Sequence, residues 1–193
     1  MNIDTTQIYF PSEDTFLLIK AALAEVKPTD RVLEIGTGSG AVAKALHEVT
    51  PSVLAVEINP HAAAYAHEVN GVEVIRGDLF EPITGEFDLI LFNAPYLPTS
   101  PEERYDDWLE YALDGGPTGR KVIERFLHDA PAHLSTFGRI LLLISSLTSM
   151  DEVLNLCRTQ ALIALVVAED RQEDGEILYV LRISRDLCSL CRT

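Results

Sequence analysis

The sequence predicts an α/β fold in which helices cover both faces of a mostly parallel β-sheet. Short runs rich in leucine and β-branched residues alternate with amphipathic segments of helix length, which is typical of repeated strand–helix–strand units. The first run leads into a glycine-rich turn, Gly36-Thr37-Gly38, that opens a helix. Only a short polar turn separates the last two runs, which predicts a hairpin with an antiparallel last strand.

The elements follow in order along a chain of 193 residues, a length that fits one domain with one core, residues 1–193. Residues 1–27 are expected to form an N-terminal helical segment. In it Ser12 can cap a helix, Glu13 and Asp14 are favourable in its first turn, and a proline at position 28 ends it. The expected strands are 31–35, 53–57, 72–75, 87–92, 139–145, 162–168 and 177–183, the expected polar turn of the hairpin is 169–176, and the other helices are 41–49, 60–70, 118–133 and 149–158.

Two segments stand outside this alternation. Residues 94–119 are rich in proline and glycine and too long for a simple connection, so they are expected to be a loop that faces the substrate. Residues 186–193 are expected to be a frayed tail. Within the tail, Cys188 and Cys191 have the spacing of metal ligands, but a single pair cannot supply the four ligands of a structural zinc site. No metal site is therefore predicted.

Composition limits the cellular location and the partners. Hydrophobic residues make up 47% of the chain, yet no apolar run approaches the roughly 20 residues that span a membrane. The three cysteines fit a reducing compartment, and the N-terminus lacks the pattern of a secretory signal, so a cytoplasmic location is expected. The net charge of -15 argues against bare nucleic acid as a direct substrate, because phosphates are normally bound by a basic surface.

The glycine turn predicts a cofactor site. Gly36, Gly38 and Ala41 have the spacing of a dinucleotide fingerprint, so the glycines alone leave a nicotinamide cofactor open. Glu34 separates the two possibilities, since its carboxylate at the strand tip would repel a pyrophosphate and attract a cation. S-adenosyl-L-methionine carries a cationic ammonium and a cationic sulfur, and it is therefore the favoured cofactor.

Two more acidic side chains are expected to bind the same cofactor. Glu57 closes the second strand, where a carboxylate can accept hydrogen bonds from ribose hydroxyls. Asp78 follows the third strand and can accept from the adenine amine, while Leu79 supplies its backbone amide to the ring; the alternative for Asp78 is a turn residue beside Gly77. The carboxyl ends of adjacent parallel strands are where open α/β sheets bind ligands.

The fourth strand ends in a candidate acceptor site, Asn93-Ala94-Pro95-Tyr96. Asn and Pro also favour plain turns, but these residues follow a strand expected beside the glycine turn. A planar NH2 group is a poor nucleophile and must be held in place. The side-chain oxygen of Asn93 and the carbonyl of Ala94 can accept its hydrogen bonds, and Tyr96 can stack on the planar group.

These residues make the chain resemble a known family. The seven expected strands with a closing hairpin resemble the Rossmann-like sheet of class I methyltransferases, whose last strand inserts antiparallel. The chain is also similar to the HemK-like N5-glutamine methyltransferases, in their short archaeal and eukaryotic branch. The similarity rests on the segment 9–18, the glycine turn, Glu57, Asp78, the acceptor tetrapeptide and the segment 115–120. That family usually has Asn-Pro-Pro-Tyr, so Ala94 departs from it but keeps the carbonyl.

The resemblance implies an activity and partners. The acceptor would be the glutamine amide in the Gly-Gly-Gln motif of a class 1 peptide-release factor. Thr15 would reach the methionine end of the cofactor, with Glu34, Gly36 and Asn93 beside it. The N-terminal recognition domain of the bacterial members is not expected in this chain, and a small zinc-binding activator protein would be the heterodimer partner. It could cover the expected edge strand 72–75.

Three alternatives remain at this point. An adenine or guanine N-methyltransferase acting on nucleic acid would use the same tetrapeptide, since an aromatic amine poses the same geometric problem. Methylation of a protein lysine is another, although the tetrapeptide fits a planar amide better than an ammonium. The third is a non-catalytic scaffold that binds the cofactor, for which Ala94 is the only indication.

Overall fold

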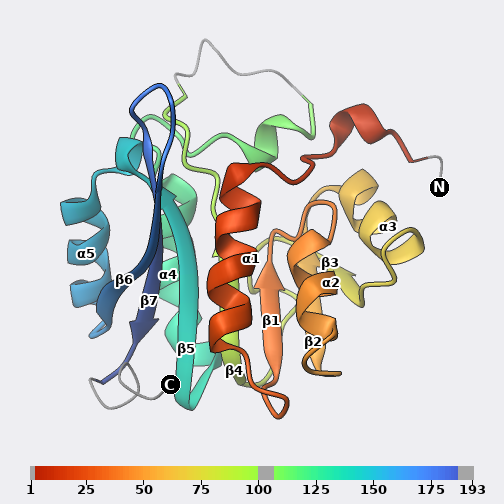
Figure 1. Ribbon diagram of the computed structural model, residues 1–193, viewed down its shortest axis with the longest axis horizontal. Helices are drawn as coiled ribbons and strands as arrows, with labels where there is room; N and C mark the ends of the chain where they lie inside the picture. Colours follow the sequence, from red (N-terminus) through yellow and green to blue (C-terminus); the bar gives the residue numbers. More distant parts are fainter. Residues whose placement is uncertain (1–2, 100–106, 187–193) are drawn as a thin grey trace.

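A computed structural model describes residues 3–99 and 107–186, which form a seven-stranded sheet (Figure 1). The strand order is β3-β2-β1-β4-β5-β7-β6. The pairs within β3, β2, β1, β4 and β5 are parallel, and β7 lies antiparallel between β5 and β6. The predicted fold class, including the inserted antiparallel last strand, is confirmed. The strands are β1 (Val32–Ile35), β2 (Val53–Glu57), β3 (Val74–Arg76), β4 (Phe87–Asn93), β5 (Leu134–Ser145), β6 (Ile163–Arg171) and β7 (Ile177–Ser184).

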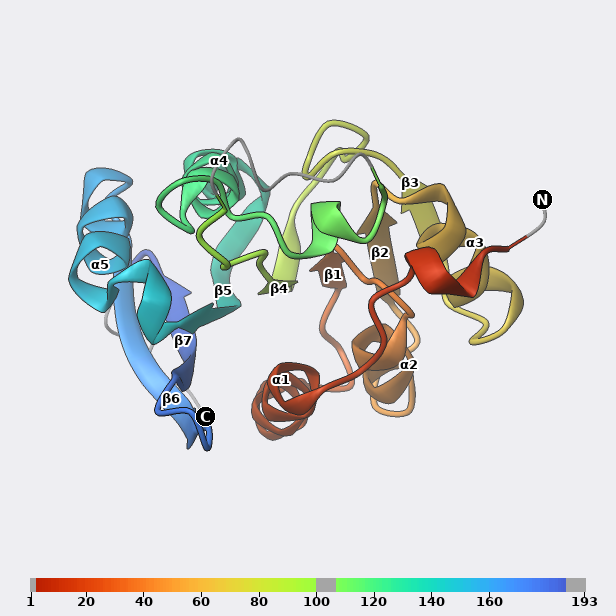
Figure 2. The same cartoon turned by 90° about the horizontal axis from the view of Figure 1, so that it is seen from above.

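Helices cover both faces of the sheet, as expected (Figure 2). One face packs its buried apolar side chains against α1 and α2, with Ala66 of α3, and the other against α4 and α5. Each face of the parallel region is therefore buried, which explains why these strands are continuously apolar in sequence. The helices are α1 (Glu13–Glu25), α2 (Ala41–His47), α3 (Pro60–Glu68), α4 (Lys121–Asp129) and α5 (Met150–Thr159), and the 3-10 helices are η1 (Thr5–Gln7), η3 (Glu110–Ala112), η4 (Ala130–His133) and η5 (Ser146–Thr148).

Several expected element bounds and one expected helix cap were wrong. The helix predicted over 118–133 begins only at Lys121, after Gly119 with its φ of 69°, and it changes to a 3-10 helix at Ala130, before Pro131. The predicted polar turn 169–176 is shorter, because β6 continues to Arg171 and pairs with β7. Ser12 occupies the N-cap position of α1 but makes no capping bond, since its hydroxyl bonds to the neighbouring carboxylate.

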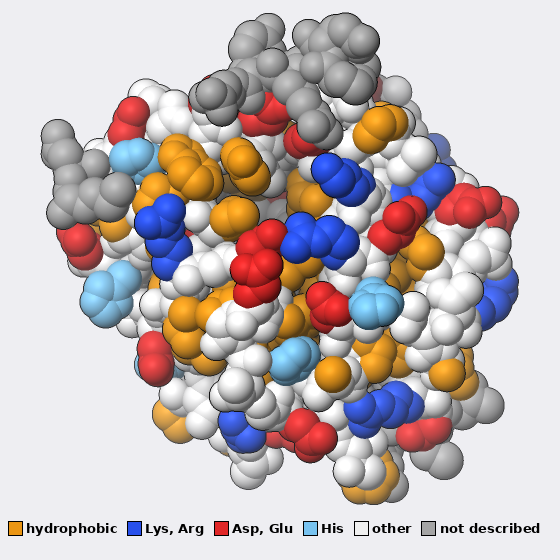
Figure 3. All heavy atoms as spheres, turned by 180° about the vertical axis from the view of Figure 1, so that it is seen from behind, with side chains coloured by type: hydrophobic (Ala, Val, Ile, Leu, Met, Phe, Trp, Pro, Cys, Tyr) orange, Lys and Arg blue, Asp and Glu red, His pale blue; other side chains and the backbone are white. Residues whose placement is uncertain are grey.

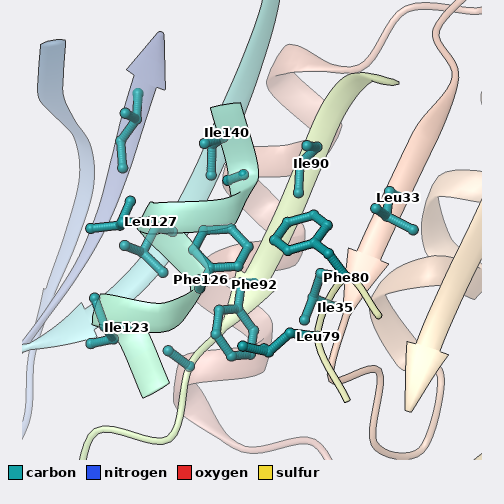
Figure 4. Close-up of a cluster of buried hydrophobic side chains, with 14 of the residues drawn as sticks. Leu33, Ile35, Leu79, Phe80, Ile90, Phe92, Ile123, Phe126, Leu127 and Ile140 are labelled. Atoms are coloured by element: carbon teal, nitrogen blue, oxygen red, sulfur yellow. The ribbon is translucent and has the colours of Figure 1, made fainter. Parts of the chain in front are cut away.

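An aromatic cluster on the α4 side fixes the end of β4 (Figure 4). The ring of Phe126 lies 4.8 Å from that of Phe92 and 5.4 Å from that of Phe80, measured between centroids. Such pairs add to the burial energy of the rings themselves. Phe92 also lies against the glycine turn, because a Cβ on Gly36 would be only 3.2 Å from its ring. The residue that follows Phe92 is Asn93, so this packing holds the candidate acceptor site beside the candidate cofactor site.

A buried ion pair lies at the amino ends of the strands, away from that site. The guanidinium of Arg139 on β5 is 2.7 Å from the Asp30 carboxylate and 3.4 Å from that of Glu25, and it donates to the Asp88 carbonyl at 2.9 Å. Only 6% of the Arg139 side chain is exposed. A buried carboxylate that loses its cation has a large desolvation cost.

Charge is mixed on the face of the molecule shown in Figure 3. Basic and acidic side chains lie interspersed there, with hydrophobic side chains between them. That face therefore offers no continuous basic surface of the kind that bare nucleic acid requires. Across residues 3–99 and 107–186, every helix is too short or too polar to cross a membrane.

We predict that Arg139→Met destabilises the protein by about 3–5 kcal/mol, since Asp30 would remain buried without its cation. Urea denaturation followed by circular dichroism would measure the free energy of unfolding. Arg158→Met is the matched control, because Arg158 lies exposed on α5, and it should stay within about 0.5 kcal/mol of wild type. Equal stability of the two variants would contradict a stabilising role for this ion pair.

Candidate active site

A cavity of about 510 Å³ lies where β1, β2 and β4 end. The chain leaves β1 toward β2 and β3 on one side, and β4 returns to the other side of β1. This reversal of strand order opens a crevice at the carboxyl ends of the strands, where ligands bind in open α/β sheets. The volume is within the usual range of roughly 300–1,000 Å³ for small-molecule sites.

The glycine turn forms one wall of the cavity with bare backbone. Gly36 and Gly38 have φ values of 64° and 54°, a region that favours glycine. A Cβ on Gly38 would lie 3.3 Å from the Tyr9 carbonyl, so the N-terminal segment closes over this turn. Gly40 then caps α2 in a left-handed conformation. The turn therefore lines the cavity with backbone rather than side chains.

Two buried carboxylates lie beneath this wall. Glu34 accepts from the Thr37 hydroxyl at 2.7 Å and from the Ala43 amide at 2.9 Å, so one of its oxygens braces the glycine turn against α2. Glu57 accepts from the amides of Gly38 and Asn59 at 2.7 and 2.8 Å. Burial raises the pKa of both carboxyls, that of Glu34 to about 8. A cationic ligand in the cavity would offset this cost of burial.

Asp78 and Leu79 line the far side of the cavity, after β3. The Asp78 carboxylate accepts from the Arg125 guanidinium of α4 at 2.8 Å. Leu79 is buried with a φ of 49°, which is unusual for a branched side chain and is found where the surroundings hold the backbone firmly. The turn after β3 is therefore held by α4 as well as by the sheet.

A hydrogen-bonded group joins α1 to the end of β4. The Asn93 side-chain amide donates to one oxygen of Asp14 at 3.0 Å, and the Tyr9 hydroxyl donates to the same oxygen at 3.0 Å. The other Asp14 oxygen accepts from the backbone amide and the hydroxyl of Thr15. The Asn93 Oδ1 is buried and has no hydrogen-bond partner within the described residues. A buried acceptor without a donor is costly and points to a missing ligand group.

The predicted substrate-facing loop covers the cavity. The structure describes its residues 94–99 and 107–119, and the backbones of Leu97 and Gly115 join its two limbs by a hydrogen bond of 2.9 Å. Trp108 reaches across to the N-terminal segment, where its amide donates to the Gln7 side chain at 2.9 Å, and the Arg76 guanidinium lies 5.9 Å from its ring. The described part of the loop thus forms a roof over the cavity.

Glycine allows the loop to approach the acceptor tetrapeptide. At Gly119, with a φ of 69°, a Cβ would lie 2.5 Å from the Tyr96 carbonyl oxygen. No side chain can fit there without moving the backbone of Tyr96. The Gly115-to-Gly119 segment therefore fixes the position of Tyr96, whose side chain lines the cavity.

The structure brings all of the sequence-predicted site residues to this one cavity, although their roles are not tested by their position. They are Thr15, Glu34, Gly36, Gly38, Glu57, Asp78, Leu79, Asn93, Ala94, Pro95 and Tyr96. Cys188 and Cys191 lie outside the described residues.

Sequence reasoning missed several cavity residues, among them Tyr9, Asp14, Trp108 and Arg125. Asp14 was interpreted only as a favourable charge in the first turn of a helix. The pattern Tyr9-x-x-x-x-Asp14 gives no indication that both side chains point to a strand far along the chain. The signal in the sequence that could have found it is the helical spacing of Asp14 from the apolar residues Leu17, Leu18 and Ala21, since a charge on an apolar helix face needs a partner.

Comparison with known proteins decides the family. Residues 13–105 match the model of the methyltransferase small domain. The chain is 43% identical to MJ0928 of Methanocaldococcus jannaschii, a candidate protein N5-glutamine methyltransferase, over 77% of this chain and 78% of that protein. It is 37% identical to methyltransferase HEMK2 of Mus musculus over 92% of this chain and 90% of that protein. The chain belongs to the HemK-like N5-glutamine methyltransferase family.

A solved structure extends this membership to the fold. The E. cuniculi Mtq2–Trm112 complex, responsible for methylation of the eRF1 translation termination factor, superposes with a TM-score of 0.76 at 28% identity. The match covers 93% of this chain and 99% of the matched chain. The family resemblance inferred from sequence is therefore confirmed, and the protein is an enzyme of the methyltransferase class.

The cavity of this methyltransferase predicts a pH-dependent stability. Burial raises the Glu34 pKa from its ordinary value of 4.5 to about 8. Between these values the unfolded chain releases the Glu34 proton while the folded chain keeps it, so the free energy of unfolding falls as the pH rises. The stability contribution is fully present below pH 4.5 and is lost as the pH approaches 8.

Glu34→Gln cannot ionise, and we expect it to flatten this decline in the ligand-free protein. Denaturant unfolding at several pH values from 5 to 8 would measure the slope. Some slope should remain, because burial raises the Glu57 pKa as well. An unchanged slope would show that Glu34 ionises in the folded protein at its ordinary pKa.

Proposed function

We propose that this protein transfers a methyl group from S-adenosyl-L-methionine to the glutamine side-chain amide in the Gly-Gly-Gln motif of a class 1 peptide-release factor. The observation that carries the proposal is the buried Asn93 Oδ1 without a hydrogen-bond partner in the described residues, at the end of β4 and in the wall of the cavity. This oxygen can accept a hydrogen bond from an amide NH2 group. The neighbouring Ala94 carbonyl is a second acceptor in the family pattern.

The residues of the cavity fit the proposed cofactor. Gly36 and Gly38 line the cavity with bare backbone, and the buried carboxylates of Glu34 and Glu57 favour a cation over a pyrophosphate. Thr15 donates both its amide and its hydroxyl proton to Asp14, so its hydroxyl oxygen keeps acceptor positions that suit an ammonium. When bound, the cofactor supplies a methyl group on a cationic sulfur, which is a strong electrophile.

The chain's own residues would orient the nucleophile. The lone pair of an amide nitrogen is delocalised, so catalysis depends on holding the nitrogen in line with the methyl group. Asn93 Oδ1 and the Ala94 carbonyl would accept its two hydrogens, and the half-buried Tyr96 ring would stack on the amide plane. Burial raises the Tyr96 pKa, so its hydroxyl stays protonated and its ring stays neutral. Proton loss would follow methyl transfer, without a strong base.

The choice of acceptor rests on the family and on charge. One relative carries N5-glutamine methylation in its name, and the complex of known structure acts on a translation termination factor. A net charge of -15 makes a nucleobase in bare nucleic acid a poor alternative. A planar amide also fits the tetrapeptide better than a lysine ammonium, which has three hydrogens and no plane to stack.

A small zinc-binding activator protein is the partner we propose, by analogy with the solved two-protein complex. β3 is an edge strand of the sheet, and its Ile75 side chain is exposed. Val69, which lies just after α3 and a few residues before β3, is also exposed. Unpaired strand edges with apolar side chains suit a second chain that adds backbone hydrogen bonds. The proposed location is cytoplasmic, where translation termination takes place.

The direct test is transfer of labelled methyl from S-adenosyl-L-methionine to purified release factor, with and without the activator. A release factor whose Gly-Gly-Gln glutamine is replaced serves as the control substrate. We expect label only on the factor with the intact glutamine. Label on both factors, or label only on nucleic acid that co-purifies with the enzyme, would contradict the proposed acceptor.

Two variants should separate acceptor binding from cofactor binding. Asn93→Ala removes the side-chain oxygen that would accept a hydrogen bond from the reacting amide. The kcat should therefore fall by at least about 100-fold, while the cofactor Kd stays within a few fold of wild type. Glu57→Ala should instead weaken cofactor binding, which isothermal titration calorimetry would measure. Full activity of Asn93→Ala would refute the acceptor site, and an unchanged Kd of Glu57→Ala would refute the ribose contact.

A further inference from the structure

The carboxylate of Asp14 is buried, with 4% of the residue exposed, and it has no cation among the partners in its immediate hydrogen-bonded group. Four donors surround it. Thr15 supplies its backbone amide and its hydroxyl to Oδ1, while Tyr9 and Asn93 each donate to Oδ2 at 3.0 Å. A carboxylate has about four lone-pair positions, so this one is fully used. Asp14 therefore has no acceptor position left for a cofactor or a substrate.

The arrangement determines which end of the Asn93 amide faces the cavity. The two ends of the amide have similar shape, but only the NH2 end can donate to a carboxylate. Burial, and then the Asp14 carboxylate, raise the Tyr9 pKa, so the Tyr9 hydroxyl stays protonated and donates its single hydrogen to Asp14. With its NH2 end held by Asp14, Asn93 is left with Oδ1 as the free end, and this is the buried atom without a partner.

Resting on the function proposed above, we propose that Asp14 is a positioning residue that locks the Asn93 amide with its oxygen toward the methyl acceptor. The lock matters because the reverse orientation would direct an NH2 group at the acceptor NH2. Two donors repel each other, so the acceptor nitrogen would lose the hydrogen bond that holds it in line for transfer. Asp14 would thus set the polarity of the acceptor site without touching the substrate.

Asp14→Asn tests the lock with almost no change in shape. The new oxygen is needed by the Thr15 amide, so the new NH2 group would face Tyr9 and Asn93. The Tyr9 oxygen can accept one of its hydrogens, and Asn93 can accept the other only by turning its oxygen away from the cavity. We expect kcat to fall on the order of 100-fold, with the release-factor KM, the cofactor Kd and the melting temperature close to wild type.

The double variant Asp14→Asn with Asn93→Asp should restore activity. A carboxylate at position 93 has acceptors at both ends, so it can accept from the new NH2 group and still present an oxygen to the substrate amide. We expect at least about tenfold more turnover than for Asp14→Asn alone. Asn93→Asp alone should stay weak, because two carboxylates would then share one buried site. Asp151→Asn, the same change on the exposed start of α5, is the matched control and should leave turnover unchanged.

Nitrogen-15 NMR of the Asn93 side-chain amide gives a readout that needs no substrate. In the wild type one Nδ2 hydrogen is bound to a buried carboxylate, and it should exchange slowly with solvent. In Asp14→Asn the turned NH2 group would face the cavity, and exchange should become at least about tenfold faster. Equal exchange in the two proteins would overturn the proposed lock, whichever substrate the enzyme uses.

The outcomes separate this inference from the proposed function. Suppose that the wild type labels the release-factor glutamine. If Asp14→Asn then keeps the wild-type kcat, or if the double variant turns over no faster than either single variant, the positioning role is wrong and the proposed function stands. If wild type does not label the glutamine, the proposed function fails, and the NMR exchange rates alone decide whether Asp14 holds Asn93. Loss of turnover with rescue by the double variant and faster exchange in Asp14→Asn would support the positioning role.

Discussion

The register between β1 and β4 is the constraint on which the site depends. The parallel pairing sets Ile35 opposite Phe92, so Gly36, which follows β1, and Asn93, the last residue of β4, lie at the same level. The glycine turn and the acceptor tetrapeptide therefore begin side by side, although more than fifty positions separate them in the chain. A one-residue shift would turn the buried faces of β4 to the wrong sides. The contacts of the Phe92 ring with Gly36 and with the Phe126 ring oppose any such shift.

The site gathers groups that are costly to bury. Glu34, Glu57 and Asp14 are all buried carboxylates, and Asn93 Oδ1 is a buried acceptor without a donor in the described residues. Backbone amides and hydroxyls stabilise the carboxylates in the absence of a cation, through the glycine turn and the first turn of α1. The two apolar layers on either side of the sheet offset the remaining cost. A site preorganised in this way needs little rearrangement when charge develops during transfer.

The N-terminal segment and the loop after β4 complete the cavity from opposite sides. Gln7 and Trp108 meet through a hydrogen bond, and Tyr9 and Asn93 meet at Asp14. Each contact joins the first residues of the chain to the end of the fourth strand or to the loop that follows it. The roof of the cavity therefore depends on contacts between segments that are far apart in the chain.

Much of the fold followed from local patterns. Apolar runs located the strands, the closing hairpin predicted the antiparallel insertion, and strand-end carboxylates together with the glycine turn predicted which residues line the cavity. The predictions about the cavity succeeded because the carboxyl ends of parallel strands always meet at one edge of the sheet. Element ends were less accurate: strand pairing extended β6 to Arg171, beyond the residues whose sequence suggested a turn.

The sequence by itself determined the chemistry that is available: a glycine turn, acidic strand ends and an Asn-Ala-Pro-Tyr acceptor site, at the carboxyl ends of expected parallel strands. Only the tertiary structure decided how these groups are held. That Asp14 binds the NH2 end of Asn93, that Thr15 is already committed to Asp14, and that Arg125 holds Asp78 are all contacts between distant segments. Hydrogen-bond direction depends on which donor meets which acceptor in space, and no local spacing in the sequence records that.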